Sequence, residues 1–126
     1  MEQRLAVAES EIIKTLAYDP CVIVGRGAAA ALKEEHVLKV FIHADRNRRA
    51  ARAVNQYGVA PKQAESFLSR CDKRRADYFK FTTATNWKDA DIYHLCLNSG
   101  KLGIAQCVEV LYQICVHGEG SIRSSL

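Results

Sequence analysis

The sequence lacks several features that would place it in a specialised class. No apolar run reaches the roughly 18 residues that a membrane-spanning helix needs. Two prolines and seven glycines among 126 residues argue against extensive disorder. The five cysteines are an odd number, are scattered and form no C-x-x-C pair, so the sequence indicates neither a disulfide framework nor a zinc site. These absences predict one cytoplasmic domain with reduced, mostly buried thiols.

A loop that grips a triphosphate is also missing. Such a loop reads G-x-x-x-x-G-K-[ST] and opens a helix, so that backbone N–H groups and a lysine meet the phosphates. The only Gly-Lys pair is Gly100-Lys101, which is followed by Leu102 and has no glycine five positions before Gly100. We therefore expect that this chain does not by itself hold a nucleoside triphosphate in the usual way.

Positive charge is concentrated in two places, although the net charge is only +4. The first cluster lies in region 46–52 and the second in region 70–75; together they comprise Arg46, Arg48, Arg49, Arg52, Arg70, Lys73, Arg74 and Arg75. Local accumulations of arginine and lysine of this kind suit a phosphate-bearing partner.

The apolar pattern predicts helices that alternate with strands. Short apolar runs at 21–24, 37–42 and 93–97 are typical of strands covered on both faces of a parallel sheet. Helical patterns or helix-sized segments cover 2–17, 28–35, 45–57, a long stretch from about 61, and 104–116. This order predicts an α/β fold of three layers, a parallel sheet with flanking helices, in which a helix precedes the first strand as though the chain began in mid-fold.

One pattern favours a dinucleotide site. The run from Gly25 to Ala30 fits G-x-G-x-x-A directly after an expected strand, and Asp45 lies at a suitable distance to meet a ribose. The helix that follows is short for a crossover, and a helix precedes the supposed first strand. A strand-to-loop turn that uses the conformational freedom of glycine is the simpler interpretation.

The long helix after Pro61 carries an arginine on its apolar side. Its stripe comprises Ala64, Phe67, Leu68, Cys71, Tyr78 and Phe79, with Arg75 in the middle. Asp72 lies three residues before Arg75, so the two side chains can orient one another. Two interpretations stay open: a partly buried ion pair that fixes packing, and an arginine that binds an anionic ligand.

The arginines of the preceding helix are harder to interpret in isolation. Ala50, Val54 and Tyr57 are expected to face the core, which places Arg48 and Arg52 on the opposite side and Arg49 at the flank. A charge run of this kind is usually a solvated face, and the sequence alone favours that interpretation.

These residues also carry a resemblance. In chain order they are Glu11-Ile12-Ile13, Cys21-Val22-Ile23-Val24-Gly25-Arg26-Gly27, the run 37–42 followed by Ala44, Arg49 and Arg52, then Asp72-Lys73-Arg74-Arg75-Ala76-Asp77-Tyr78-Phe79, and Tyr93-His94-Leu95-Cys96-Leu97-Asn98-Ser99. Over residues 9–115 the chain resembles the C-terminal two-thirds of bacterial cytidylate kinase-like proteins.

The resemblance implies a nucleoside monophosphate kinase fold, with a P-loop-type α/β sheet and a mobile lid at about 45–80. It implies phosphoryl transfer from ATP, with Mg²⁺, to a CMP-like acceptor. Arg26, Asp72 and Arg75 would bind that acceptor, and the lid arginines Arg49 and Arg52 would contact the transferring phosphoryl group. Arginine suits these roles because its planar fork matches phosphate oxygens.

Two departures from the family pattern bear on function. Gly27 stands where cytidylate kinases have aspartate after Gly-Arg, which puts cytosine specificity in question. The family's first strand and phosphate loop are expected before Met1, so residues 1–117 are expected to form an N-terminally incomplete domain without a donor site, followed by a flexible tail at 118–126. The expected partner is a nucleoside monophosphate, with no nucleic acid and no membrane. A non-catalytic nucleotide-binding or interaction module, pairing through an exposed sheet edge, is the alternative.

Overall fold

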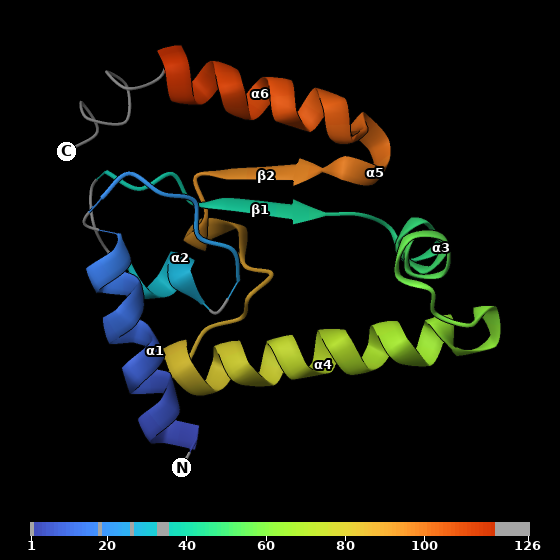
Figure 1. Cartoon of the computed structure of the whole chain (residues 1–126), viewed down its shortest axis with the longest axis horizontal. Helices are drawn as coiled ribbons and strands as arrows, with labels where there is room; N and C mark the ends of the chain where they lie inside the picture. Colours follow the sequence, from blue (N-terminus) through green and yellow to red (C-terminus); the bar gives the residue numbers. More distant parts are fainter. Residues whose placement is uncertain (1, 18, 26, 33–35, 118–126) are drawn as a thin grey trace.

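The computed structural model describes residues 2–17, 19–25, 27–32 and 36–117. The expected tail at 118–126 and the end of the expected helix 28–35 therefore lie outside the described residues. The helices and strands, shown in Figure 1, are α1 (Glu2–Leu16), α2 (Ala28–Ala31), β1 (Val40–His43), α3 (Arg46–Tyr57), α4 (Ala64–Thr83), β2 (Leu95–Asn98), α5 (Ser99–Leu102) and α6 (Ile104–His117), with 3-10 turns η1 (Pro61–Gln63) and η2 (Ala90–Ile92).

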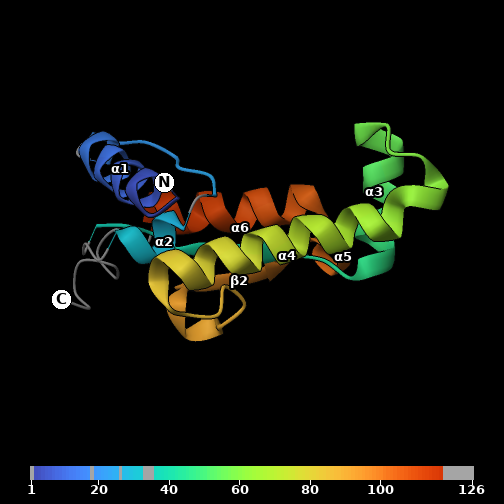
Figure 2. The ribbon, with the colours of Figure 1, turned by 90° about the horizontal axis from the view of Figure 1, so that it is seen from below.

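The chain is a mostly helical α/β protein with a small parallel sheet. β1 pairs with β2 in parallel, in a register that runs from Val40 opposite Leu95 to His43 opposite Asn98. Figures 1 and 2 place the two strands between α6 on one side and α4 on the other. The alternation of strands and helices is thus confirmed for two of the three expected strands, at 37–42 and 93–97.

The strand expected at 21–24 is not formed. These residues have no regular secondary structure, and Val22 and Val24 are 91% and 88% exposed. A strand exists only where a neighbour takes up its backbone N–H and C=O groups. Within the described part of the chain, β1 pairs with β2 alone. The apolar composition of this run was therefore insufficient to make it a strand.

Local sequence signals set the ends of α3 and the start of α4. The Asp45 side chain accepts a hydrogen bond from the Arg48 backbone N–H at 2.9 Å and so caps α3. Gly58, at φ 69°, ends α3 in the left-handed conformation that glycine adopts without strain. Pro61 then opens η1, which leads into α4. This short connection places α4 beside α3.

The core is small, and α4 contributes more of its buried residues than any other element. Its buried apolar residues are Ile13, Leu32, Ala53, Ala64, Leu68, Phe79, Leu97 and Cys107. The accessible surface of 9525 Å² exceeds the roughly 6,700 Å² typical of a compact monomer of this mass. The predicted stripe of α4 is confirmed at Ala64, Leu68 and Phe79.

Two expectations about burial were wrong. Tyr57, expected to face the core, is 66% exposed because α3 ends there, at the tip of the turn to η1. Cys107 is buried, but Cys21, Cys96 and Cys115 are exposed free thiols, since the small core does not extend over the elements that carry them. None of the described helices is both long and apolar enough to cross a membrane.

Candidate functional site

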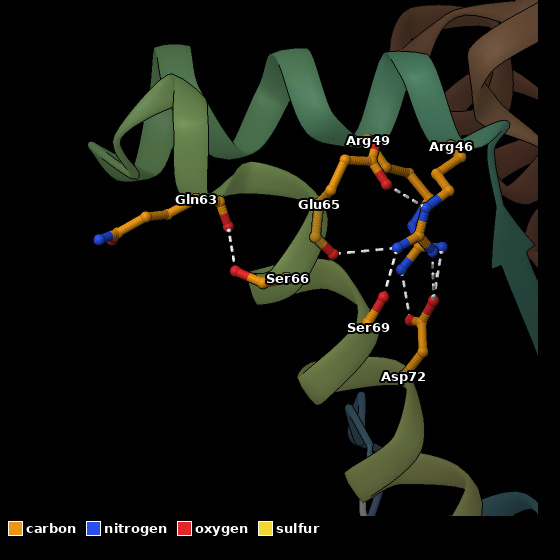
Figure 3. A network of polar contacts seen from close by, with 7 residues as sticks. All are labelled: Arg46, Arg49, Gln63, Glu65, Ser66, Ser69 and Asp72. Atoms are coloured by element: carbon orange, nitrogen blue, oxygen red, sulfur yellow. Dashed lines mark hydrogen bonds and ion pairs between the residues drawn. The ribbon is translucent and has the colours of Figure 1, made fainter.

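Helices α3 and α4 are joined by an arginine–carboxylate pair. Arg49 Nη1 donates a hydrogen bond to Asp72 Oδ2 at 2.9 Å, and Arg49 Nη2 donates to Oδ1 of the same carboxylate (Figure 3). The two side chains are only 28% and 18% exposed. Parallel charge-assisted bonds of this kind fix orientation as well as charge. Arg49 therefore turns toward α4 rather than into solvent.

Two more arginines lie near the Asp72 carboxylate. Arg46 Nη1 is 3.9 Å and Arg75 Nη1 is 3.8 Å from its oxygens. The hydrogen bond from Arg49 holds the pKa of Asp72 below its ordinary value, with the positive charges of Arg49 and Arg75 acting in the same direction and burial acting against them. Asp72 is thus ionised at neutral pH and is the negative centre of a cationic cluster.

Arg46 adds a second set of bonds across the same two helices. Its side chain is bonded to the Glu65 carboxylate, and its Nη2 donates to the Glu65 carbonyl at 3.0 Å and to Ser69 Oγ at 2.5 Å (Figure 3). Glu65 and Ser69 lie one turn apart on α4. Sequence reasoning missed this network, because neither residue belongs to a motif and only their place on α4 brings them to Arg46.

An aromatic cluster borders the site on the side of Arg75. The Arg75 guanidinium lies 5.2 Å from the centre of the Trp87 ring. Phe41 contacts Trp87 edge-on at 5.4 Å and stacks on Tyr93 at 5.0 Å. Tyr93 Oη donates a hydrogen bond to the Trp87 carbonyl at 2.7 Å. Burial raises the pKa of Tyr93, with the nearby Cys96 adding to the rise and Arg75 opposing it.

The structure brings together three of the five residues singled out from the sequence. Arg49, Asp72 and Arg75 form one cluster. Arg52 is exposed on α3 and makes no hydrogen bond or ion pair to the rest of the described chain, and Arg26 lies outside the described residues. The solvated-face interpretation therefore holds for Arg52 and fails for Arg49. The proposed roles of all five in ligand binding stay predictions.

The described part of the chain does not have the strand and crossover helix that a dinucleotide site at Gly25 to Ala30 would need. Among the described residues before Gly25 there is no strand, and α2 after Gly27 has four residues, too few for the crossover helix of a dinucleotide fold. Asp45, the expected ribose partner, caps α3 instead.

No metal centre is evident in the described ranges, where no three His, Cys, Asp or Glu residues gather as potential ligands. The Asp72 carboxylate, the least exposed acid of the cluster, is already engaged by arginine. The residues present at this site therefore do not fit a Mg²⁺ ion.

Fold and site together define an α/β protein that gathers arginines around one carboxylate. Comparison with known families identifies it further: the model of the cytidylate kinase-like family matches residues 1–101. The chain belongs to the cytidylate kinase-like family. The crystal structure of an uncharacterized protein from Eubacterium ventriosum is similar, with 26% identity and a TM-score of 0.81. The match covers 88% of this chain and 64% of that one, and no curated protein matches.

Proposed function

We propose that this chain supplies the acceptor-binding and lid half of a nucleoside monophosphate kinase with a P-loop-kinase-like fold. The reaction would transfer a phosphoryl group from ATP to a CMP-like nucleoside monophosphate. The observation that supports this most is the junction of Arg49, Asp72 and Arg75 across α3 and α4. Membership of the cytidylate kinase-like family supports the reaction class.

The chemistry explains why such a cluster is useful. Phosphoryl transfer needs little covalent help from the protein and depends on positioning and charge neutralisation. Two guanidinium groups that share one carboxylate can both turn to a phosphate, whose oxygens match the arginine fork. In this proposal Asp72 orients the arginines and meets the acceptor sugar, Arg75 binds the acceptor phosphate, and Arg49 and Arg52 contact the transferring group.

The donor side is not provided by these residues. The sequence has no G-x-x-x-x-G-K-[ST] segment, and the cluster around Asp72 does not fit Mg²⁺. ATP and Mg²⁺ are implied by the family alone. We expect the purified chain to show no ATP-dependent phosphorylation of CMP, UMP or AMP, while still binding the acceptor. Turnover that survives extensive purification and disappears with Arg75→Met would contradict this division of labour.

Acceptor binding is tested by thermal unfolding in the presence of CMP, cytidine or NAD. A ligand at 100 times its dissociation constant stabilises a protein by about 2.7 kcal/mol. We expect stabilisation by CMP that is lost in Arg75→Met and weakened in Arg49→Met, because Arg49 fixes the orientation of Asp72, which meets the acceptor sugar in this proposal. Arg48→Met is the matched control, because Arg48 lies on the same helix with a 64% exposed side chain. Stabilisation by NAD alone, or equal loss in the control, would overturn the proposal.

A second candidate function is self-association through the sheet region. Val22 and Val24 are exposed, and the second edge of β1 has no ladder partner among the described residues. The accessible surface is also larger than that of a compact monomer of this mass. These three observations favour self-association. The partner would be a second copy, since one exposed edge can pair with its symmetry mate. Light scattering over a range of concentrations tests it: we expect a dimer that Val24→Lys dissociates, and a monomer at every concentration would exclude it.

A further inference from the structure

Arg75 is held at the cluster in a different way from Arg49. Its nearest Asp72 oxygen is 3.8 Å away, and its side chain is 57% exposed. It makes no hydrogen bond to any described residue, so its N–H donors are left for a ligand. The closest defined contact of its guanidinium face is the Trp87 ring, at 5.2 Å from the ring centre. The position of Arg75 therefore depends on an aromatic residue that no motif had pointed to.

The Trp87 ring is itself fixed from the side of the sheet. Phe41, in β1, meets the ring edge-on at 5.4 Å. Tyr93, directly after η2, donates a hydrogen bond to the Trp87 carbonyl at 2.7 Å. These contacts anchor both the ring and its backbone. A long arginine side chain that rests on such a surface keeps fewer rotamers than one in open solvent, and so loses less freedom when a ligand arrives.

We propose that Trp87 is a positioning residue for Arg75 and prepares its guanidinium for a phosphate monoester. The inference rests on the proposed function, since it assigns the ligand of Arg75 to the acceptor phosphate. A cation over an aromatic face leaves the edge of the guanidinium available, and the edge carries the five N–H donors that recognise phosphate oxygens. Trp87 thus acts through Arg75 and does not itself contact the ligand.

The chain offers a matched control on the same ring. Lys88 Nζ lies 5.4 Å from the centre of the Trp87 ring, a distance close to that of Arg75. Lys88 is a point charge without a planar fork. Removing its charge with Lys88→Met should leave acceptor binding almost unchanged if the ring serves Arg75 specifically.

The test compares dissociation constants for CMP and for cytidine in the parent protein, Trp87→Leu, Trp87→Phe and Lys88→Met. A cation–π contact at an exposed site is worth about 0.5–1 kcal/mol, which corresponds to a roughly two- to fivefold weaker CMP affinity for Trp87→Leu. Cytidine, which lacks the phosphate, should bind the parent and Trp87→Leu alike. Trp87→Phe should restore part of the loss, because a smaller aromatic face remains. Unchanged CMP binding by Trp87→Leu, or an equal loss for CMP and cytidine, would overturn the inference.

The same residue supplies a direct spectroscopic readout, because Trp87 is the only tryptophan in the chain. Its fluorescence should differ between the parent and Arg75→Met without ligand, and CMP should change the emission of the parent but not of Arg75→Met. Arg74→Met, on the exposed side of α4, should behave like the parent. A parent that does not bind CMP overturns the proposed function and this role with it. A parent that binds CMP with the same affinity as Trp87→Leu overturns only the role of Trp87.

Discussion

The Asp72 carboxylate can be dissected by a double-mutant cycle. Asp72→Asn keeps the size of the side chain and removes its charge, and Arg49→Met keeps much of the apolar stem and removes the guanidinium. Hydrogen bonds to charged groups contribute about 1.5–3 kcal/mol net. The Arg49 and Asp72 side chains are still 28% and 18% exposed, so solvent screening reduces the expected coupling to about 1–2 kcal/mol.

A second double-mutant cycle, between Asp72 and Arg75, should give a smaller coupling energy. Arg75 is 57% exposed and 3.8 Å from the carboxylate, so its coupling to Asp72 should stay below about 0.5 kcal/mol. Urea unfolding followed by far-UV circular dichroism provides the four stabilities of each cycle. A coupling for Arg75 and Asp72 as large as that for Arg49 and Asp72 would refute this reasoning. It would mean that Arg75 is a packing residue and not one left available for a ligand.

Acid dependence gives an independent check of the same pair. The pKa of Asp72 is lowered in the folded state, chiefly by the hydrogen bond from Arg49. Because the pKa of Asp72 is lower in the folded than in the unfolded state, where it is about 3.9, the ionised carboxylate stabilises the fold above that pH. This contribution to stability is lost as the pH falls below the unfolded-state pKa. The stability difference between the parent and Asp72→Asn should therefore shrink below about pH 4. A difference that is constant from neutral pH to pH 3 would contradict the assignment.

Three further perturbations test other parts of the structure. The pKa of Tyr93 is raised mainly by burial, so the neutral phenol of Tyr93 should stabilise the fold below about pH 10, and this contribution should be lost at higher pH. Unfolding measured at alkaline pH should show this dependence in the parent and not in Tyr93→Phe. Asp45→Ala should cost about 1 kcal/mol in urea unfolding through loss of the α3 cap, and Asp45→Asn much less. Gly58, at φ 69°, should tolerate Asn better than Ala, with a cost of about 1 kcal/mol for Ala in thermal unfolding.

Patterns within one element were predictable from the sequence. The stripe of α4, the start of α4 after Pro61 and the neighbouring positions of Asp72 and Arg75 depend only on helical geometry and local propensity. Each of these patterns could be recognised in the sequence because its residues are no more than about four positions apart or repeat at helical spacing.

Contacts between elements were not predictable in the same way. Arg49 and Asp72 are 23 positions apart, and their bond depends on how α3 crosses α4. The contact of Arg75 with Trp87 depends on the path of the chain after α4. The run at 21–24 has the composition of a buried strand, but strand formation needs a neighbour with matching backbone groups, which composition does not encode.

The large accessible surface has a consequence for how unfolding experiments on this chain will look. With 9525 Å² accessible in the folded state, unfolding exposes roughly 10,900 Å², against roughly 13,700 Å² for a compact protein of equal mass. The denaturant m-value and the heat-capacity change both scale with this area, so both should be about a fifth smaller. A shallower denaturation curve magnifies mutational effects on the midpoint, because the midpoint shift equals the change in free energy divided by the m-value.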